Sequence, residues 1–264
     1  MQSLFDEIAE FNSSVVVLVS TRVELDAMRN KLNCKNVHSA QGLELISGYV
    51  NNLPCVVALM GVGKTNAAMT TALMIHMVNP QAVICAGVGG GLNPQLTLGD
   101  VVIATKVAQH DYGKLTNNGF EVWQTKSPTR SIPYPLYIPA DTELLSQAEI
   151  AGEKLCLFEG LAAEDNRCPR IIMGKIVTGD NLVLSSSKRT ELHEMYQADA
   201  IDMEGGAVVQ VCRRLNVPQL LIRSIVDIDE VNSEIHWKNH METSSDNASR
   251  LVFALLAERS RLVN

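Results

Sequence analysis

The sequence predicts an α/β fold: a three-layer single domain in which helices flank a twisted, mostly parallel central sheet. Apolar runs of strand length recur along the chain and alternate with stretches patterned as helices. These runs are apolar at successive positions, a pattern typical of strands that are buried on both faces. The chain has 264 residues, of which 46 % are hydrophobic and 19 % are charged, so it can bury a large core.

Each expected strand is one of these apolar runs, from "SVVVLVS" near the start of the chain to "QLLIRSIVD" near its end. In order, the strands are predicted at 14–20, 43–50, 55–60, 81–88, 100–109, 170–179, 198–203 and 219–227. The helices are predicted at 22–33, 65–78, 142–155, 188–196, 205–215 and 240–260. Strands that alternate with helices usually form parallel pairs, so a mostly parallel sheet is expected.

Two segments of the predicted domain, 1–264, fall outside this alternation. Residues 1–13 are expected to form an N-terminal extension. Residues 111–139 contain four of the nine prolines and many turn-forming residues, which predicts a long loop that leaves the sheet. A loop of this length in a compact domain usually serves a function or forms an interface.

Charge and composition exclude several classes of partner. The net charge is −7, and lysine and arginine form no cluster, so neither nucleic acid nor an anionic membrane surface is expected as a partner. No apolar run reaches the ~18 residues of a membrane-spanning helix. The acidic N-terminus does not have the pattern of a signal peptide, and the six cysteines form no CxxC pair. We therefore expect a cytoplasmic protein.

The turn "GVGKT" at 61–65 has the ending of a phosphate-binding P-loop. A P-loop needs a glycine five residues before its Gly-Lys-Thr, but Ala58 occupies that position. An ATPase of this class also needs an apolar strand that ends in a magnesium-binding Asp, and the nearest candidate, 220–227, has Arg223 in its middle. ATP binding is therefore disfavoured. The two glycines form either a tight turn without a ligand or part of a different site.

Glycines and carboxylates gather where the predicted strands end. In a sheet of this kind, ligands bind beyond the carboxyl ends of the strands. Three glycine turns follow strands there, together with four acidic residues: Glu24, Asp202, Glu204 and Asp227. Glycines let a ligand approach the backbone closely, and carboxylates favour a neutral, hydroxyl-rich or basic ligand over a phosphate.

Four stretches of the sequence carry a family resemblance. "GVGKTNAA" is similar to a GIGKxxAA turn, "AGVGGGLNPQLTLGDVVIATKVAQHD" to TGxAGGLxxxLxxGDIVxxxxxxxHD, and "VTGDNLV" to SGDxFI. "AIDMEGGAVVQVCRRLNVPQLLIRSIVDIDE" is similar to AVEMExxAxAxVCxxxxVPFxxxRxISDxxD. The chain thus resembles the methylthioadenosine/S-adenosylhomocysteine nucleosidases of the nucleoside phosphorylase superfamily. The similarity runs from about residue 14 to the C-terminus and is nearly collinear outside 111–139.

The resemblance implies cleavage of an adenine N-glycosidic bond, which builds positive charge on the ribose and negative charge on the base. It implies that Asp227 is the general acid, facing N7 and the exocyclic amine of adenine. Glu204 would hold the ribose hydroxyls, with Met203 beneath the sugar. Glu24 would activate the attacking water, with Arg223 beside it.

Further residues are expected to contact the substrate. Leu182 and Val183 take the positions of a Phe-Ile pair in the family, so an aliphatic side chain replaces the aromatic stacking partner. The main chain around Val183 would read the adenine edge. Trp237 falls where the family has an aromatic residue over the base.

The turn at Val88 departs from the family, which has a serine there, close to the water and the ribose. Valine cannot form the hydrogen bonds of that serine. Gly89 of the same turn is also expected to contact substrate. The same role is expected of Asp202, at a position where the family usually has glutamate.

The nucleophile is expected to be water. Related phosphorylases hold phosphate with two arginines and a serine or threonine. Arg22 is the only cation near the corresponding positions, and Glu24 adds a negative charge. The expected function is therefore hydrolysis of 5′-thio- or 5′-deoxyadenosine nucleosides, such as methylthioadenosine or S-adenosylhomocysteine, to adenine and a ribose derivative.

Two alternatives remain open: a purine nucleoside phosphorylase, and a catalytically impaired nucleoside-binding protein, for which Val88 and Leu182 are the hints. The expected partner is a small-molecule adenine nucleoside, with no metal and no organic cofactor. The resemblance also implies a homodimer in which the 111–139 loop of one subunit helps to close the 5′ pocket of the other. The identity of the 5′ substituent stays open.

Overall fold

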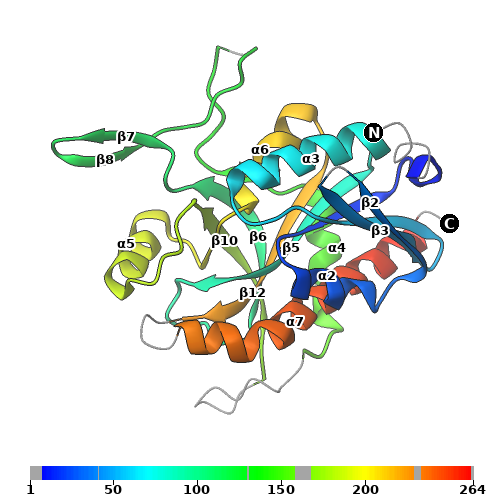
Figure 1. Ribbon diagram of the computed structural model, residues 1–264. Coiled ribbons are helices and arrows are strands. Elements are labelled where there is room, and N and C mark those ends of the chain that lie inside the picture. Colours follow the sequence, from blue (N-terminus) through cyan, green and yellow to red (C-terminus); the bar gives the residue numbers. More distant parts are fainter. Residues whose placement is uncertain (1–7, 41, 130, 158–167, 229–232, 263–264) are drawn as a thin grey trace.

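The computed structural model describes residues 8–40, 42–129, 131–157, 168–228 and 233–262 (Figure 1). The strands are β1 (Val15–Val19), β2 (Asn33–Ala40), β3 (Leu43–Val50), β4 (Leu53–Leu59), β5 (Ala82–Gly91), β6 (Val101–Gln109), β7 (Gly113–Thr116), β8 (Gly119–Val122), β9 (Ile138–Pro139), β10 (Ile171–Thr178), β11 (Ala200–Asp202) and β12 (Gln219–Asp227). The helices are η1 (Ala9–Phe11), α2 (Arg22–Arg29), α3 (Lys64–Val78), α4 (Thr142–Glu153), α5 (Ser186–Tyr196), α6 (Gly205–Leu215) and α7 (Ser233–Leu262).

The central sheet is mixed, where a mostly parallel one was predicted. Within the described ranges its order is β11-β10-β6-β12-β5-β1-β4-β3-β2, and β9 pairs with β6. Parallel pairs join β4, β1, β5 and β12, and also β6, β10 and β11. The pairs β2–β3, β3–β4 and β6–β12 are antiparallel. Two residues separate β2 from β3 and β3 from β4, too few for the crossover that a parallel pair needs.

One further pairing shapes the region where a ligand is expected. The last residue of β5, Gly91, pairs antiparallel with Ala200 of β11. Since β5 also pairs with β12, β12 with β6, β6 with β10 and β10 with β11, these five strands close into a ring. The closure brings the end of β5 beside the turn between β11 and α6.

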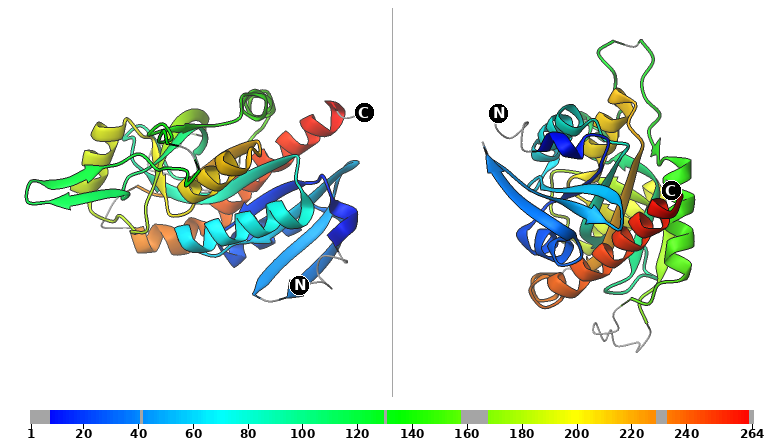
Figure 2. Two further views of the ribbon diagram at one scale, coloured as in Figure 1. Left: turned by 90° about the horizontal axis from the view of Figure 1, so that it is seen from above. Right: turned by 90° about the vertical axis from the view of Figure 1, so that its right-hand side faces the viewer.

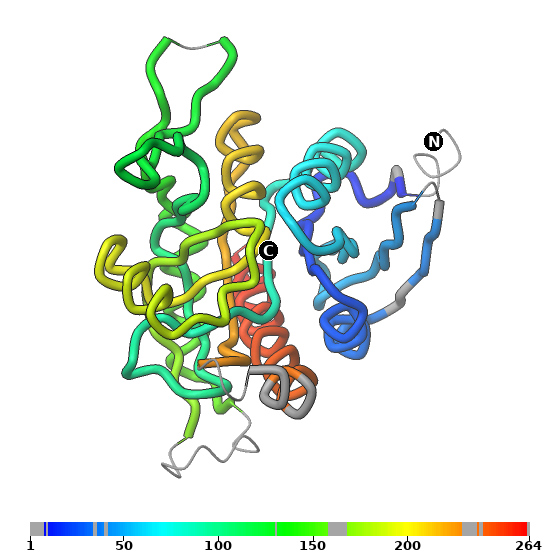
Figure 3. The backbone as a smooth tube through the Cα atoms, turned by 60° about the vertical axis from the view of Figure 1, so that its left-hand side comes forward, coloured from blue at the N-terminus to red at the C-terminus, as the bar shows by residue number. Residues whose placement is uncertain are grey.

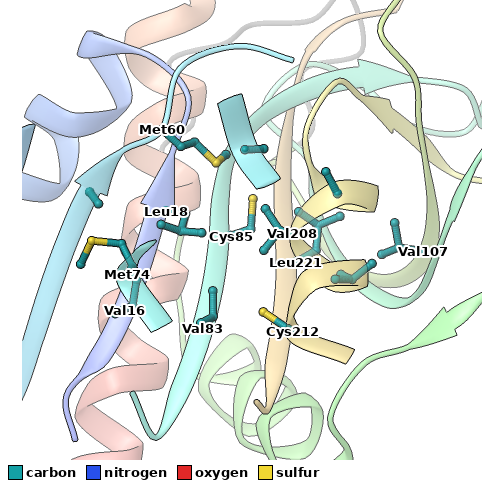
Figure 4. Packing of buried hydrophobic residues seen from close by; sticks show 14 of the residues in the cluster. Val16, Leu18, Met60, Met74, Val83, Cys85, Val107, Val208, Cys212 and Leu221 are labelled. Atoms are coloured by element: carbon teal, nitrogen blue, oxygen red, sulfur yellow. The ribbon is translucent and has the colours of Figure 1, made fainter. Parts of the chain in front are cut away.

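Helices cover both faces of the sheet, which confirms the predicted α/β fold. α3 and α6 pack together on one face, while α2, α4 and α7 pack together on the other. Figure 4 shows the first face, where Leu18 and Cys85 of the sheet belong to one buried cluster with Met74 of α3 and Val208 of α6. The C-terminal helix α7 returns to pack against α2, near the start of the chain (Figure 3). None of the helices in the described part of the chain is long and apolar enough to cross a membrane.

Some predicted boundaries were wrong. The helix expected at 22–33 ends at Arg29, and β2, which was not predicted, follows it. β2 has the polar sequence "NCKNVHSA" and lies at the edge of the sheet, so it has no apolar run to reveal it.

Ile8 and Phe11 are fully or almost fully buried in the core. Part of the expected N-terminal extension therefore belongs to the folded body.

The segment predicted as a loop at 111–139 contains an antiparallel ribbon, β7–β8, which forms a separate two-stranded sheet. The ribbon extends away from the central sheet (Figures 1 and 2). Its apolar side chains Leu115 and Phe120 are 83 % and 44 % exposed. An isolated two-stranded ribbon is marginally stable in water, so this ribbon is suited to contact with another surface.

Candidate active site

A cavity of about 380 Å³ opens where the strand ends and glycine turns meet. Its lining comes from the carboxyl-terminal ends of β5, β11 and β12, from the turns that follow β1, β4 and β11, and from the first turn of α2. The loop before α5 and Trp237 of α7 complete it. Ten of the eleven residues predicted for the site line it: Glu24, Val88, Gly89, Leu182, Val183, Asp202, Met203, Glu204, Asp227 and Trp237. Arg223 does not line the cavity.

Glu24 lies in the first turn of α2 and is 2 % exposed. The backbone N–H groups of Ser20 and Thr21 both donate to its Oε2 at 2.8 Å, and that of Val88 donates to Oε1 at 2.8 Å. The Thr21 N–H bond is one half of a capping box, and in the other half the Glu24 N–H donates to the Thr21 hydroxyl. This pair of bonds explains why a Thr-x-x-Glu sequence starts a helix here. A side chain on Gly87 would place a Cβ 2.1 Å from Oε1, so the glycine makes room for this carboxylate.

Glu204 lies between β11 and α6 and is 4 % exposed. The backbone N–H of Gly63 donates to its Oε1 at 2.9 Å, and Arg223 Nη2 lies 3.5 Å from its Oε2. Burial raises the pKa of Glu204 from 4.5 to about 7; the nearby Asp202 and Glu24 add to this rise, while Arg223 and the Gly63 N–H oppose it. Glu204 can therefore hold a proton near neutral pH.

This shift in pKa predicts a pH dependence of stability. The folded protein keeps a proton on Glu204 between about pH 4.5 and pH 7, whereas the unfolded chain releases it. This group therefore makes the free energy of unfolding fall as pH rises through that window. Chemical denaturation across this range should show a weaker fall for Glu204→Gln than for the wild type. Equal slopes in the two proteins would contradict the shift.

The GVGK turn holds carboxylates in place of a phosphate. Gly63 is the N-cap of α3 with φ of 93°, a conformation that favours glycine, and its N–H is bonded to Glu204. The next N–H, of Lys64, donates to Asp180 Oδ1 at 2.8 Å, and Lys64 Nζ donates to Asp111 at 2.6 Å. Since two carboxylates occupy the N-terminus of α3, the structure gives no support to ATP binding there.

Arg223 and Asp202 form a buried ion pair beside Glu204. Arg223 is fully buried, and its Nη2 lies 2.7 Å from Asp202 Oδ2. Asp202 also accepts hydrogen bonds from the Thr178 hydroxyl and the Gly205 N–H, so both its oxygens are engaged. Arg223 therefore has its ion pairs with Asp202 and Glu204.

Asp227 is paired with an arginine that the sequence did not reveal. Arg189 Nη2 donates to Asp227 Oδ1 at 2.8 Å, and the two side chains are 5 % and 6 % exposed. The charged group in direct contact with Asp227 is therefore a cation. Arg189 belongs to a polar helical stretch, "SSSKRTELHEMY", whose pattern indicates a solvent-exposed surface.

The side chains around the cavity mouth are mostly apolar. Leu182 and Trp237 are 64 % and 42 % exposed, so both side chains have apolar surface that a ligand in the cavity can cover. Val88 is 8 % exposed and packs in a small apolar cluster with Val226 and Met241. This packing accounts for valine at the position where a serine was expected.

The described lining has no clamp for phosphate. Arg22, the one cation expected near the nucleophile, is ion-paired with Glu44 and does not line the cavity. Arg189 and Arg223 are committed to the carboxylates described above. The described lining is therefore suited to a neutral ligand.

Known proteins resemble this chain over most of its length. The family model of the phosphorylase superfamily matches residues 14–257. The 5′-methylthioadenosine/S-adenosylhomocysteine nucleosidase of Mycobacterium tuberculosis is 31 % identical over 251 residues, which cover 92 % of this chain and 96 % of that protein. The solved nucleosidase of the same name from Neisseria meningitidis, in complex with methylthio-immucillin-A, has a TM-score of 0.79 and 29 % identity, covering 93 % of this chain and 99 % of that one. The nucleosidase from Colwellia psychrerythraea, in complex with adenine, has a TM-score of 0.79 and 25 % identity, covering 94 % and 96 %.

Proposed function

Since the chain belongs to the phosphorylase superfamily and, within it, to the methylthioadenosine/S-adenosylhomocysteine nucleosidase family, we propose that it hydrolyses the N-glycosidic bond of 5′-thio- or 5′-deoxyadenosine nucleosides. The products are adenine and a ribose derivative, which gives the enzyme a place in methionine salvage. One observation carries the proposal. A single cavity holds Glu24, Glu204 and Asp227, with Glu24 fixed by three backbone N–H groups and no cation of the described lining left to clamp phosphate.

Each carboxylate has its own part in the reaction. As the C–N bond breaks, positive charge grows on the ribose and the electron pair moves into the purine. Asp227 gives a proton to N7 of the leaving base, and Glu204 accepts hydrogen bonds from the ribose hydroxyls. Glu24 takes a proton from the water that attacks C1′. Arg223 and Asp202 hold Glu204 in place, and Gly63 donates to it from the opposite turn.

Hydrolysis should be independent of phosphate. We expect the protein to release adenine from 5′-modified adenosines in phosphate-free buffer, at a rate that added phosphate leaves unchanged. Release of adenine from a panel of such nucleosides, followed by chromatography, makes the measurement. A rate that rises with phosphate and yields a ribose 1-phosphate would identify a phosphorylase. Binding of the nucleoside in calorimetry without any turnover would identify a nucleoside-binding protein.

Val88→Ser tests the ribose side of the site. A hydroxyl at this position can hydrogen-bond to the water or the ribose, so we expect hydrolysis to be preserved or raised. The single hydroxyl replaces both methyl groups that Val88 packs against Val226 and Met241, at a cost of about 1–2 kcal/mol in the free energy of unfolding. Steady-state kinetics and chemical denaturation make the two measurements. A large loss of activity in a folded variant would mean that valine is adapted to a different ligand.

The assembly and the location of the protein are also part of the proposal. A homodimer is supported by the exposed apolar side chains of the 111–139 segment, among them Leu115, Phe120 and Ile132. In this arrangement the segment of one subunit covers the 5′ end of the other subunit's cavity. Sedimentation velocity tests the dimer. A single domain is supported by the central sheet that runs from β2 to β11. A cytoplasmic location is supported by the free thiols of the buried Cys55, Cys85 and Cys212.

A further inference from the structure

Arg189 stands at the centre of a buried hydrogen-bond network beside the cavity. It is 4 % exposed, although it belongs to the first turn of a helix whose sequence is polar. Its Nη2 donates to Asp227 Oδ1 at 2.8 Å, and its Nη1 donates to the carbonyl oxygen of Gly91 at 3.0 Å and lies 3.4 Å from that of Asp227. Its Nε donates to the carbonyl oxygen of Val183 at 3.0 Å.

These bonds tie a loop to the ends of two strands that already pair with each other. Gly91 ends β5, Asp227 ends β12, and Val183 lies in the loop between β10 and α5. Val183 and Asp227 are the two residues expected to meet the edge of the purine. A single guanidinium therefore sets their positions relative to each other before any ligand is bound.

A second observation shows that the backbone leaves space for the ion pair of Arg189 and Asp227. A Cβ on Gly90 would lie 2.7 Å from Asp227 Oδ1 and 3.3 Å from Arg189 Nη1. The first distance is shorter than any normal carbon–oxygen contact, so a side chain at this position would displace the carboxylate from the guanidinium. Glycine at position 90 leaves the space that the ion pair fills.

We propose that Arg189 is the positioning residue of the base site: it holds Asp227 and the main chain of Val183 in the geometry that binds and protonates the purine. The inference rests on the proposed function. Because Oδ1 already accepts a hydrogen bond from Arg189, the proton that goes to the base is carried by Oδ2.

The same contact favours the proton transfer itself. When the C–N bond breaks and N7 takes the proton from Oδ2, Asp227 becomes a carboxylate. Asp227 pairs with Arg189 as a carboxylate in the free protein and takes this proton from solvent before the transfer. Relative to the protonated state, the attraction of Arg189 for Asp227 is stronger after the proton has left. An interaction that strengthens along the reaction lowers the barrier, and its loss appears in kcat more than in KM.

The test compares Arg189→Met with Arg259→Met. Arg259 provides a matched control, because its side chain is 13 % exposed and contacts Glu143 and Gln147, none of which lines the cavity. We expect kcat of Arg189→Met to fall by about 10²–10³, with a much smaller rise in KM. This loss lies within the rate enhancement that a positioned general acid usually provides. The Arg259→Met variant should keep kcat within about twofold. Equal losses in the two variants, or a change in KM alone, would overturn the proposal.

A double-mutant cycle separates positioning from a merely structural role. If Arg189 acts through Asp227, Arg189→Met should cost little in a protein that already carries Asp227→Asn, because the acid is already lost. Losses that multiply in the double variant would mean that Arg189 acts elsewhere and would overturn the inference.

Two further variants keep the test decisive if Arg189→Met folds poorly. Arg189→Ala leaves space for a small cation, so millimolar guanidinium should restore part of its kcat, and methylammonium should restore less. Gly90→Ala leaves both charges in place and should lower kcat by displacing Asp227. Absence of rescue in a folded Arg189→Ala protein, or a fully active Gly90→Ala protein, would count against the proposal.

Calorimetry with free adenine distinguishes failure of this inference from failure of the proposed function. If the wild type binds adenine but cleaves none of the nucleosides, the hydrolase proposal fails. The inference about Arg189 is then judged by affinity: Arg189→Met should weaken adenine binding by about tenfold, the cost of one misplaced hydrogen bond, and Arg259→Met should not. An unchanged affinity in Arg189→Met would overturn it, and a wild type that neither binds adenine nor cleaves would overturn both.

Discussion

Replacing Asp227 with asparagine is expected to lower turnover by about 10²–10⁴, the usual worth of a positioned general acid, while adenine binding weakens by no more than about tenfold. Asparagine has nearly the size of aspartate, and its amide oxygen can still accept the hydrogen bond from Arg189. It can also keep a polar contact with the purine edge. It cannot give N7 a proton, so the base must leave with its negative charge uncompensated.

Steady-state kinetics and adenine calorimetry on the same preparation measure the two effects. The variant leaves the buried Arg189 without a full counter-charge, so its free energy of unfolding should fall by no more than the ~3–5 kcal/mol of a broken buried pair. Thermal unfolding shows whether it is folded at the assay temperature. A folded variant that keeps more than a tenth of wild-type turnover would mean that Asp227 has only a structural part.

Replacing Glu24 with glutamine is expected to lower turnover by a similar factor, about 10²–10⁴, for a different reason. Both oxygens of Glu24 accept backbone N–H bonds, from Ser20 and Thr21 on one side and from Val88 on the other. In glutamine, one of these oxygens becomes an NH₂ group that faces a backbone donor. The amide cannot take a proton from water, and it also turns away from its carboxylate position.

Adenine affinity separates this variant from a general disruption of the site. Glu24 acts on the water and not on the base, so Glu24→Gln should bind adenine as the wild type does. The lost capping bonds should cost about 1–2 kcal/mol in the free energy of unfolding. Glu44→Gln is a matched control, because Glu44 is a partly buried acid that pairs with Arg22 and does not line the cavity. Turnover above a tenth of the wild type in Glu24→Gln would contradict a role as base.

The local hydrophobic pattern of the sequence determined which segments form helices and strands. Residues 43–50, 205–215 and 219–227 form the predicted elements with the predicted bounds, because continuous or periodic apolar runs reveal burial directly. The acidic residues at the ends of these elements also predicted the cavity. Parallel strand ends meet at one edge of a sheet whatever the details of packing, so Glu24, Glu204 and Asp227 line one site.

Only the tertiary structure decided which charges meet. Arg189 and Asp227 are 38 residues apart, and nothing near either residue in the sequence marks the other as its partner. The sequence likewise does not mark Asp202 as the partner of the fully buried Arg223. Nor does it mark Glu204, 141 residues away, as the acceptor for the Gly63 N–H. The hydrophobic pattern of a chain shows which segments are buried, but the pairing of a buried charge depends on how those segments close upon one another. Here the closure of β5 onto β11 and β12 brings the ends of those strands together, and Arg189 binds to two of them.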